Sequence, residues 1–184
     1  MTNAELERMV ETSDEWITTR TGIRERRIAG IDEATSDMAL EAARRAMTSA
    51  GVTAADIDLI IVATITPDMP FPSTACLVQQ KLGALRAVAF DIEAACSGFV
   101  YALDIGARFI EAGAHETVLI IGAEKMSSVV DWTDRNTCVL FGDGAGAAVL
   151  RHRPGARGLL TTSLGSDGSK ASLLELPGGG SACP

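Results

Sequence analysis

The sequence predicts an α/β layer in which a largely parallel sheet is covered by helices on both faces. Continuous apolar runs, typical of buried strands, alternate with stretches that carry apolar residues at helical spacing. With 184 residues, 47% of them hydrophobic, the chain can bury the core of one ordinary domain or of half of a larger two-part subunit. We find no internal repeat, linker or low-complexity segment that would divide it.

Two helices are predicted in the first part of the chain. Thr12 and Glu15 have the spacing of a capping box, which predicts a short helix over about residues 13–19 that Gly22 ends. A second helix is expected over residues 36–50, which are rich in helix formers and are followed by glycine. One stripe of this helix carries four apolar side chains, Met38, Ala42, Ala46 and Ala50.

The middle of the chain then alternates strands and helices. Residues 57–65 predict a buried strand, and a proline-rich loop and a helix capped by Ser73 follow it. Residues 87–93 predict a second strand, residues 97–113 a long helix, and residues 117–124 another continuous apolar strand. This alternation is the pattern of a parallel sheet with helical crossovers.

A glycine-rich run, GDGAGA, occupies residues 142–147 and loosely matches a dinucleotide-binding motif. It should lead into the strand AAVLR rather than into a helix, and no acidic residue stands about twenty positions further on. We therefore reject dinucleotide binding and expect these glycines to allow tight turns and close packing.

Charge and composition exclude several classes of protein. Twenty-four acidic and sixteen basic residues give a net charge of −8, which opposes nucleic acid as the main partner. The longest apolar run is too short to cross a bilayer, and the charged N-terminus does not resemble a signal peptide, so we expect a cytoplasmic chain. The four cysteines form no CxxC pair, and only His115 and His152, both expected at the surface, could add imidazole ligands, so we expect no metal site.

Cys96 stands where a predicted strand gives way to a predicted helix, within DIEAACSGFV. If the helix begins near Cys96, the sulfur lies in its first turn, where free N–H groups and the positive end of the dipole stabilise a thiolate. Small neighbours leave room for a substrate, and the N–H of Cys96 can donate to an oxyanion. A nucleophile and a buried structural cysteine both fit this position. Cys76 and Cys138 are expected to be core thiols.

Five separated segments carry a resemblance to a known family: TSDEWITTRTGIRERR, FPSTAC, DIEAACSGFVYAL, DWTDRNT and LFGDGAGAAVL. In this order and spacing they resemble β-ketoacyl-acyl-carrier-protein synthase III, the initiating condensing enzyme of the thiolase superfamily. The match runs from about residue 2 to residue 179. It implies a thiolase-like layered α/β/α half whose mixed sheet is covered by helices.

The resemblance implies an acyltransferase that initiates fatty acid synthesis. Cys96 would take an acyl group from acetyl-coenzyme A or another short acyl-coenzyme A. Malonyl-acyl carrier protein would then lose carbon dioxide, and its carbanion would attack the thioester. The resemblance implies no cofactor. It implies that the enzyme is a homodimer. A related condensing enzyme of quinolone or polyketide formation, sharing the cysteine but using another acceptor, remains an alternative.

The resemblance also implies a coenzyme A site. Its residues would be Trp16 and Arg135 on either side of the adenine, Thr12, Arg20 and Asn136 near it, and Phe141 along the pantetheine channel. Phe71 would reach into the acyl pocket of the partner subunit. A tryptophan ring and an arginine plane suit a flat base, and the alternative for Trp16 is packing on its own helix.

The rest of the arginine cluster has a simpler interpretation. We expect Arg24, Arg26 and Arg27 to be solvated surface charges, and Arg20 alone to contact the ligand.

The family pattern is incomplete in these 184 residues. Synthase III enzymes have two similar halves, and the histidine and asparagine that assist decarboxylation come from the second, in motifs that resemble HQAN and GNTS. Neither motif occurs here, nor does the first strand of the family. We therefore expect residues 1–184 to be the N-terminal half of a condensing enzyme, truncated at both ends and incomplete for condensation. A non-catalytic fragment is the third hypothesis.

Overall fold

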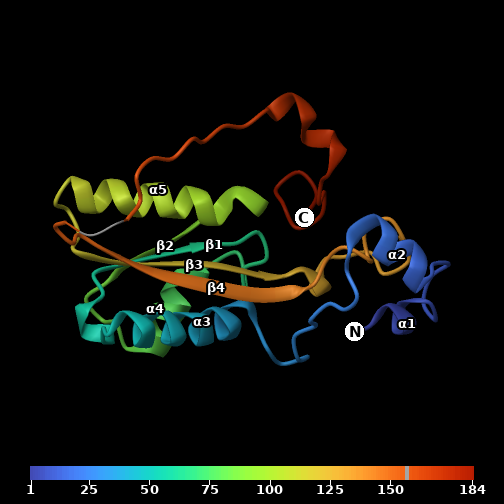
Figure 1. Ribbon diagram of the computed structural model, residues 1–184, viewed down its shortest axis with the longest axis horizontal. Coiled ribbons are helices and arrows are strands. Elements are labelled where there is room, and N and C mark those ends of the chain that lie inside the picture. Colours follow the sequence, from blue (N-terminus) through green and yellow to red (C-terminus); the bar gives the residue numbers. More distant parts are fainter. Residues whose placement is uncertain (156–157) are drawn as a thin grey trace.

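The structure, a computed structural model, describes residues 1–155 and 158–184 and is built on one mixed sheet (Figure 1). The strands are β1 (Leu59–Ala63), β2 (Val88–Ile92), β3 (Thr117–Lys125) and β4 (Asp143–Arg151), in the order β2-β1-β3-β4. β1 is parallel to β2 and β3, whereas β4 runs antiparallel to β3. The predicted α/β layer with a mixed sheet is confirmed.

Helices cover both faces of this sheet. α3 (Thr35–Ala50) and α4 (Thr74–Leu82) lie on one face, and α5 (Gly98–Glu111) lies on the other (Figure 1). Alternate β1 side chains enter the two cores: Ile60 and Val62 pack with α3 and α4, whereas Leu59 and Ile61 pack with α5. Because both faces of β1 are buried, its sequence is a continuous apolar run.

Most of the residues predicted to begin or end helices do so, and one predicted cap is wrong. Ser73 caps α4, since its Oγ accepts the N–H of Cys76 at 3.3 Å. In α2 (Asp14–Thr21), however, the N-cap is Ser13, whose Oγ accepts the N–H of Trp16 at 3.0 Å. The predicted capping box of Thr12 is therefore wrong by one residue. Gly22 ends α2 in the left-handed conformation, with φ of 74°, as predicted.

The apolar stripe of α3 that the sequence suggested is not the one that enters the core. The residues buried against the sheet are Ala39, Ala43 and Met47, each one position further on. Ala42, Ala46 and Ala50 line an open cavity of about 500 Å³ against residues 145–149 of β4, and of the three only Ala46 also packs on the described core. The helix is therefore turned so that the predicted stripe faces the edge strand.

The glycine-rich run forms most of β4 and not a turn before it. Gly144 and Gly146 are exposed, and a Cβ on either would meet nothing within 4 Å, so the expected tight turns and close packing are wrong for them. Only Gly142 is closely packed, because a Cβ there would lie 3.0 Å from both the Cβ of Arg26 and the carbonyl oxygen of Arg27. The motif lies almost entirely within a strand and leads into no helix, which is not the context of dinucleotide binding.

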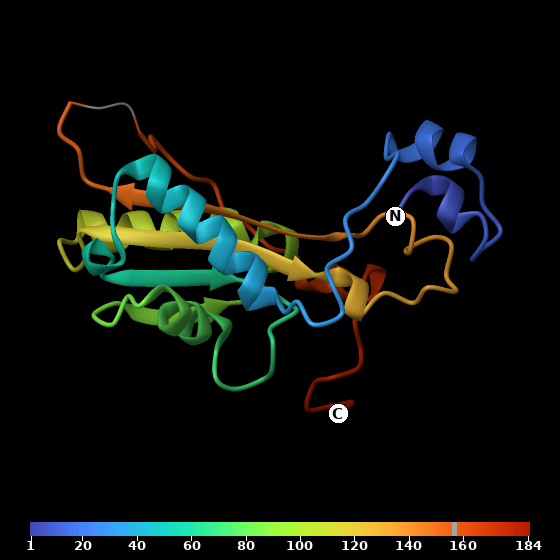
Figure 2. The same ribbon diagram turned by 90° about the horizontal axis from the view of Figure 1, so that it is seen from below.

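A second body, here called the N-terminal lobe, stands beside the sheet (Figure 2). It consists of residues 1–27, with α1 (Asn3–Leu6) and α2, and of residues 129–142. Its fully buried apolar residues are Leu6, Ile17, Cys138 and Val139. Cys138 is thus a core thiol, as predicted, and Cys76 is partly buried in α4.

Arg26 lies inside this lobe, which corrects its prediction as a solvated surface charge. Its side chain is 5% exposed and donates to Oδ1 of Asn3 at 2.8 Å and to the carbonyl oxygen of Val139 at 3.2 Å. Burial lowers the pKa of Arg26 from its ordinary value. Arg24 and Arg27 are exposed, as predicted.

The carboxylate of Asp143 joins the lobe to the sheet. It accepts the N–H of Ala29 and the N–H of Ser127, each at 2.7 Å, and the hydroxyl of Ser127 at 2.6 Å. One side chain at the start of β4 therefore fixes both chain segments that lead into the lobe.

In the described ranges 1–155 and 158–184, no helix combines the length and apolar character needed to cross a membrane.

Candidate active site

Cys96 lies at the joint between β2 and α5, close to the predicted place. It is exposed and belongs to a single 3-10 turn, Ala95–Ser97, that directly precedes α5. The sulfur is therefore one turn earlier than the first turn of the α-helix that the sequence predicted. None of the described residues buries the Cys96 side chain, which favours the nucleophile over the buried structural cysteine.

The backbone next to the thiol is unusual. Ala95 has a φ of 44°, a left-handed conformation that side chains with a Cβ rarely adopt. Such residues persist only where the surrounding structure holds them, and they concentrate at functional sites.

Gly98 holds this turn close to the sheet. It is buried, and a Cβ there would lie 2.9 Å from the Cβ of Ala63, the last residue of β1. No side chain fits between the start of α5 and the end of β1. Cys96 is consequently held over the carboxyl ends of the parallel strands, where open α/β sheets bind their ligands.

The N-terminal lobe lies off this same end of the sheet. In Figures 1 and 2, β1 and β3 point toward the lobe, and the first turn of α5 faces the same side. The thiol and the lobe that carries most of the predicted coenzyme A residues are therefore on one side of the molecule.

Two arginines lie over the Trp16 ring. The guanidinium carbon of Arg20, one turn further along α2, lies 4.5 Å from the centroid of the Trp16 ring. The guanidinium carbon of Arg135, from the other segment of the lobe, also lies at 4.5 Å. The Trp16 ring is half-buried and packs on the lobe's apolar cluster as well. Both interpretations of Trp16, stacking platform and packed side chain, thus have contacts that support them.

Two polar atoms of the predicted coenzyme A set are buried and have no hydrogen-bond partner among residues 1–155 and 158–184. They are Oγ1 of Thr12 and Nε of Arg135. Buried polar groups without a partner are uncommon in folded proteins, and each one calls for a physical account. A ligand that reaches this part of the lobe would supply one.

The other predicted ligand residues are placed as follows. Asn136 is exposed, and its side-chain amide donates to Oδ1 of Asp134 at 3.1 Å. Phe141 is half-buried in the segment that enters β4. Phe71 is 86% exposed, in the loop between β1 and α4.

The two histidines lie at the opposite end of the sheet from Cys96. His115 follows α5 and precedes β3, and His152 follows β4, whose last residue pairs with the first residue of β3. His152 is exposed, as predicted. His115 is half-buried instead of at the surface, because its ring packs 5.2 Å from that of Phe109 and its Nδ1 lies 3.6 Å from Oδ1 of Asp58.

Sequence reasoning missed the carboxylates that hold the loops around this end of the sheet. Asp91 of β2 accepts the N–H groups of Thr74 and Ala75, each at 2.7 Å, and Glu124 of β3 accepts the N–H of Ile65 at 2.9 Å. Both are acidic residues in otherwise apolar strands, which is the only signal that could have marked them. Within residues 1–155 and 158–184, no group of three or more His, Cys, Asp or Glu side chains could hold a metal ion.

Comparisons with known proteins agree with the resemblance seen in the sequence. A model of the family 3-oxoacyl-[acyl-carrier-protein (ACP)] synthase III matches residues 90–168. The chain is 58% identical, over all of its 184 residues, to a β-ketoacyl-[acyl-carrier-protein] synthase III of Caldanaerobacter subterraneus, of which it covers 56%. The chain thus spans about half the length of the curated relatives that it matches.

Solved structures give the same result. The 3-oxoacyl-(acyl carrier protein) synthase III of Pseudomonas aeruginosa is 43% identical, with a TM-score of 0.92 over 100% of this chain and 57% of its own. A priming β-ketosynthase of a polyketide biosynthetic pathway is 46% identical, with a TM-score of 0.79 over 81% of this chain and 45% of its own. The predicted resemblance to β-ketoacyl-acyl-carrier-protein synthase III is confirmed along the whole chain.

Proposed function

We propose that this chain is the acyl-accepting N-terminal half of a condensing enzyme that initiates fatty acid synthesis. The observation that carries the proposal is the exposed thiol of Cys96, held over the carboxyl end of the sheet on a turn with a left-handed alanine. The similarity to synthases named for acyl carrier protein over the whole chain supports the same assignment.

In the first step, the Cys96 thiolate attacks the carbonyl carbon of acetyl-coenzyme A or another short acyl-coenzyme A. A new carbon–sulfur bond forms, the bond to the coenzyme A sulfur breaks, and that sulfur leaves as a thiolate that takes up a proton. Backbone N–H groups of the turn at Cys96 are the nearest candidates to stabilise the oxyanion of the intermediate. The acyl group then remains on Cys96.

In the second step, malonyl-acyl carrier protein loses carbon dioxide, and the carbanion attacks the acyl-Cys96 carbonyl. The sulfur of Cys96 leaves as the β-ketoacyl product forms on the carrier protein. The loss of carbon dioxide needs donors that stabilise the developing negative charge. His115 and His152 lie at the far end of the sheet, so in this proposal the donors are the histidine and asparagine of the second half that the resemblance implies.

Coenzyme A would be held by the N-terminal lobe. Trp16 offers a ring, and Arg20 and Arg135 offer guanidinium planes and charges. The buried Thr12 hydroxyl has no partner among the residues that the structure describes. Adenine inserted between Trp16 and Arg135 needs a separation of about 7 Å, twice the contact distance of carbon atoms. Arg135 therefore has to swing outward from its position at 4.5 Å when the base enters.

The same proposal accounts for the remaining predicted features. Phe71, exposed at a loop tip, would enter the acyl pocket of the partner subunit in a homodimer. All four cysteines are free, which fits the reducing conditions of the cytoplasm.

A second function is favoured by one comparison. The priming β-ketosynthase of a polyketide pathway is as similar in sequence to this chain as the Pseudomonas aeruginosa enzyme is. Acylation of Cys96 would be common to both functions, and the carrier protein that accepts the product distinguishes them.

The proposal is tested by mass analysis of the chain after incubation with acetyl-coenzyme A. We expect one acetyl group on Cys96 and none in Cys96→Ala, because Cys76 and Cys138 are partly or fully buried and Cys183, although exposed, lies outside any helix or strand that could activate it. Acetylation of Cys76, Cys138 or Cys183 with Cys96 unmodified would overturn it. With labelled malonyl-acyl carrier protein, we expect condensation from the complete gene product and none from the 184 residues alone.

A further inference from the structure

The loop of residues 64–73, between β1 and α4, is fixed at both ends although its tip is exposed. Glu124 of β3 accepts the N–H of Ile65 at 2.9 Å where the loop begins. Asp91 of β2 accepts the N–H of Thr74 at 2.7 Å where the loop ends. Bonds from backbone N–H to a carboxylate are among the stronger hydrogen bonds in proteins, so neither end of the loop is free to shift.

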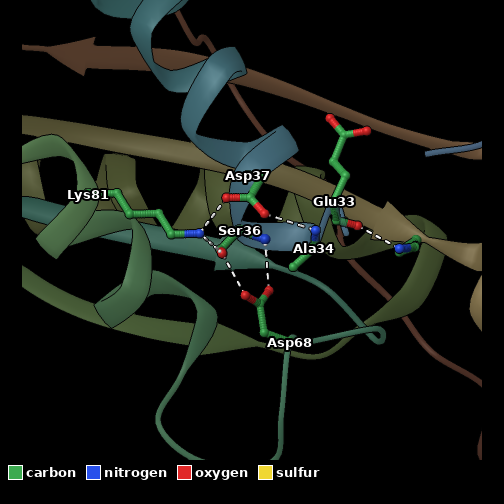
Figure 3. Close-up of polar contacts among 7 residues, drawn as sticks. Glu33, Ala34, Ser36, Asp37, Asp68 and Lys81 are labelled. Carbon is green, nitrogen blue, oxygen red and sulfur yellow. Dashed lines mark hydrogen bonds and ion pairs between the residues drawn. The ribbon is translucent and has the colours of Figure 1, made fainter. Parts of the chain in front are cut away.

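A third anchor lies in the middle of the loop, at Asp68. Its Oδ1 accepts the backbone N–H of Ser36 at 2.8 Å, and its Oδ2 accepts the Ser36 hydroxyl at 2.6 Å (Figure 3). Ser36 is fully buried in the first turn of α3. Asp68 therefore satisfies a free N–H at a helix N-terminus and places a negative charge at its positive end.

Lys81 fixes the direction of the Ser36 hydroxyl. Its Nζ lies 2.6 Å from Oγ of Ser36 and 2.6 Å from Oδ1 of Asp37, as Figure 3 shows. An ammonium group can only donate, so the Ser36 oxygen accepts from Lys81 and its own proton is left for Asp68. Since Lys81 belongs to α4, this network clamps α3, α4 and the loop together at one point.

Phe71 stands three residues after Asp68, between Pro70 and Pro72. Two proline rings restrict the backbone of this short run, whose other limit is the start of α4. The ring of Phe71 is nevertheless 86% exposed. Because the backbone is restricted, the exposure of this aromatic ring is not caused by a disordered loop. An exposed aromatic residue on a fixed backbone is typical of a contact site.

We propose that Asp68, supported by Ser36 and Lys81, is a positioning residue that fixes the Phe71 ring in the acyl pocket and so sets which acyl groups the enzyme accepts. This inference rests on the proposed function, since it takes Phe71 to line that pocket. Asp68 touches no substrate and acts only through the loop.

The matched control for Asp68 is Asp56. Asp56 accepts the N–H and the hydroxyl of Thr53, both at 2.7 Å, which are the same two kinds of bond that Asp68 makes. It precedes β1, at the opposite end of that strand from the loop. Asp68→Ala and Asp56→Ala thus remove the same two kinds of hydrogen bond, partly buried at Ser36 and exposed at Thr53, and only the first variant borders the Phe71 loop.

The experiment compares kcat/KM for acetyl-coenzyme A and isobutyryl-coenzyme A in the complete gene product and its variants. In Asp68→Ala we expect the ratio to change by about tenfold, the lower range for one methyl group in an apolar pocket. Phe71→Ala should change the ratio in the same direction, and Asp56→Ala should leave it within about twofold. Asp68→Asn should fall between, because its amide oxygen still accepts the N–H of Ser36.

Hydrogen exchange of the loop amides, which residues 65, 66, 68, 69 and 71 carry and the two prolines lack, is measured on the same proteins. It shows whether Asp68 holds the loop, independently of whether the loop sets acyl specificity. We expect faster exchange in Asp68→Ala than in Asp56→Ala. Equal exchange in these two variants, or a ratio that Asp68→Ala leaves unchanged, would overturn the positioning role. If the unmodified complete gene product forms no condensation product, the proposed function fails, and the exchange result still decides whether Asp68 holds the loop.

Discussion

The sheet layer and the N-terminal lobe are stabilised in different ways. β1 and β3 are buried on both faces by apolar side chains from three helices, and their backbones are paired along their lengths. The lobe has four fully buried apolar side chains, and its other buried residues, Asn3 and Arg26, are polar. The proposed nucleophile thus sits on the well-packed body and the proposed ligand residues on the smaller one, whose local stability is expected to be lower.

The largest effect should come from the sheet layer. Ile120→Ala removes a fully buried side chain from the middle of β3. We expect it to lower the free energy of unfolding by about 2 to 5 kcal/mol, measured by chemical denaturation, because a cavity remains. Ile31→Ala is the control, since Ile31 is 95% exposed and should change the free energy by less than about 0.5 kcal/mol. An equal loss of unfolding free energy in both variants would show that the sheet core is not the more stable region.

The next effect should be confined to the lobe. Arg26→Met keeps the apolar stem but leaves Oδ1 of Asn3 and the carbonyl of Val139 without their donors. Each buried acceptor without a partner costs about 1 to 3 kcal/mol, so lobe amides should exchange faster while those of β1 and β3 do not. The control is Arg27→Met, at an exposed position paired only with Glu25. Faster exchange throughout the sheet would show that the two bodies unfold as one.

A third effect concerns what the lobe binds. Trp16→Ala should weaken coenzyme A binding by about 1 to 3 kcal/mol, the range for losing one base stacked on an aromatic ring. Calorimetric titration measures this directly, and Trp16→Phe should recover part of the affinity because a ring is restored. Unchanged affinity in Trp16→Ala would leave Trp16 as a packing residue of the lobe.

The smallest effect depends on pH and belongs to the sheet layer. The ammonium of Lys81, followed by the N–H of Ala34, holds the pKa of Asp37 below its ordinary value of 3.8. A carboxylate with a lowered pKa stabilises the fold above that ordinary value and loses its contribution as the pH falls through the lowered one. We therefore expect Asp37→Asn to lower Tm at neutral pH, and the difference to disappear on acidification below pH 3.8. The effect should be small because both partners are partly exposed to solvent.

The same comparison shows what sequence could predict. The strands of the sheet, the cap at Ser73 and the terminating Gly22 are visible in the sequence because short runs of residues determine them. The burial of Arg26 is not visible in the sequence, because its hydrogen-bond partner Val139 lies 113 residues away. His115 was misplaced for the same reason, since Asp58 reaches it from another part of the chain.

The site divides in the same way. The position of Cys96 followed from local pattern, although the 3-10 turn before α5 shifted it by one turn. The residues that hold the surrounding loops could not be predicted from local pattern. Asp68 contacts Ser36, and Glu124 contacts Ile65, only after the sheet has formed. The roles of Thr12, Trp16, Arg20, Arg135, Asn136, Phe71 and Phe141 toward a ligand remain predictions.

The contact between Gly98 and Ala63 limits how this site can be altered. The height of the thiol above the sheet is set by two of the smallest side chains, because a Cβ at residue 98 would already lie 2.9 Å from the Cβ of Ala63. A larger residue at either position would lift the start of α5 and carry Cys96 away from the strand ends. For protein engineering, these two positions are a means to change the reach of the nucleophile without touching the nucleophile itself.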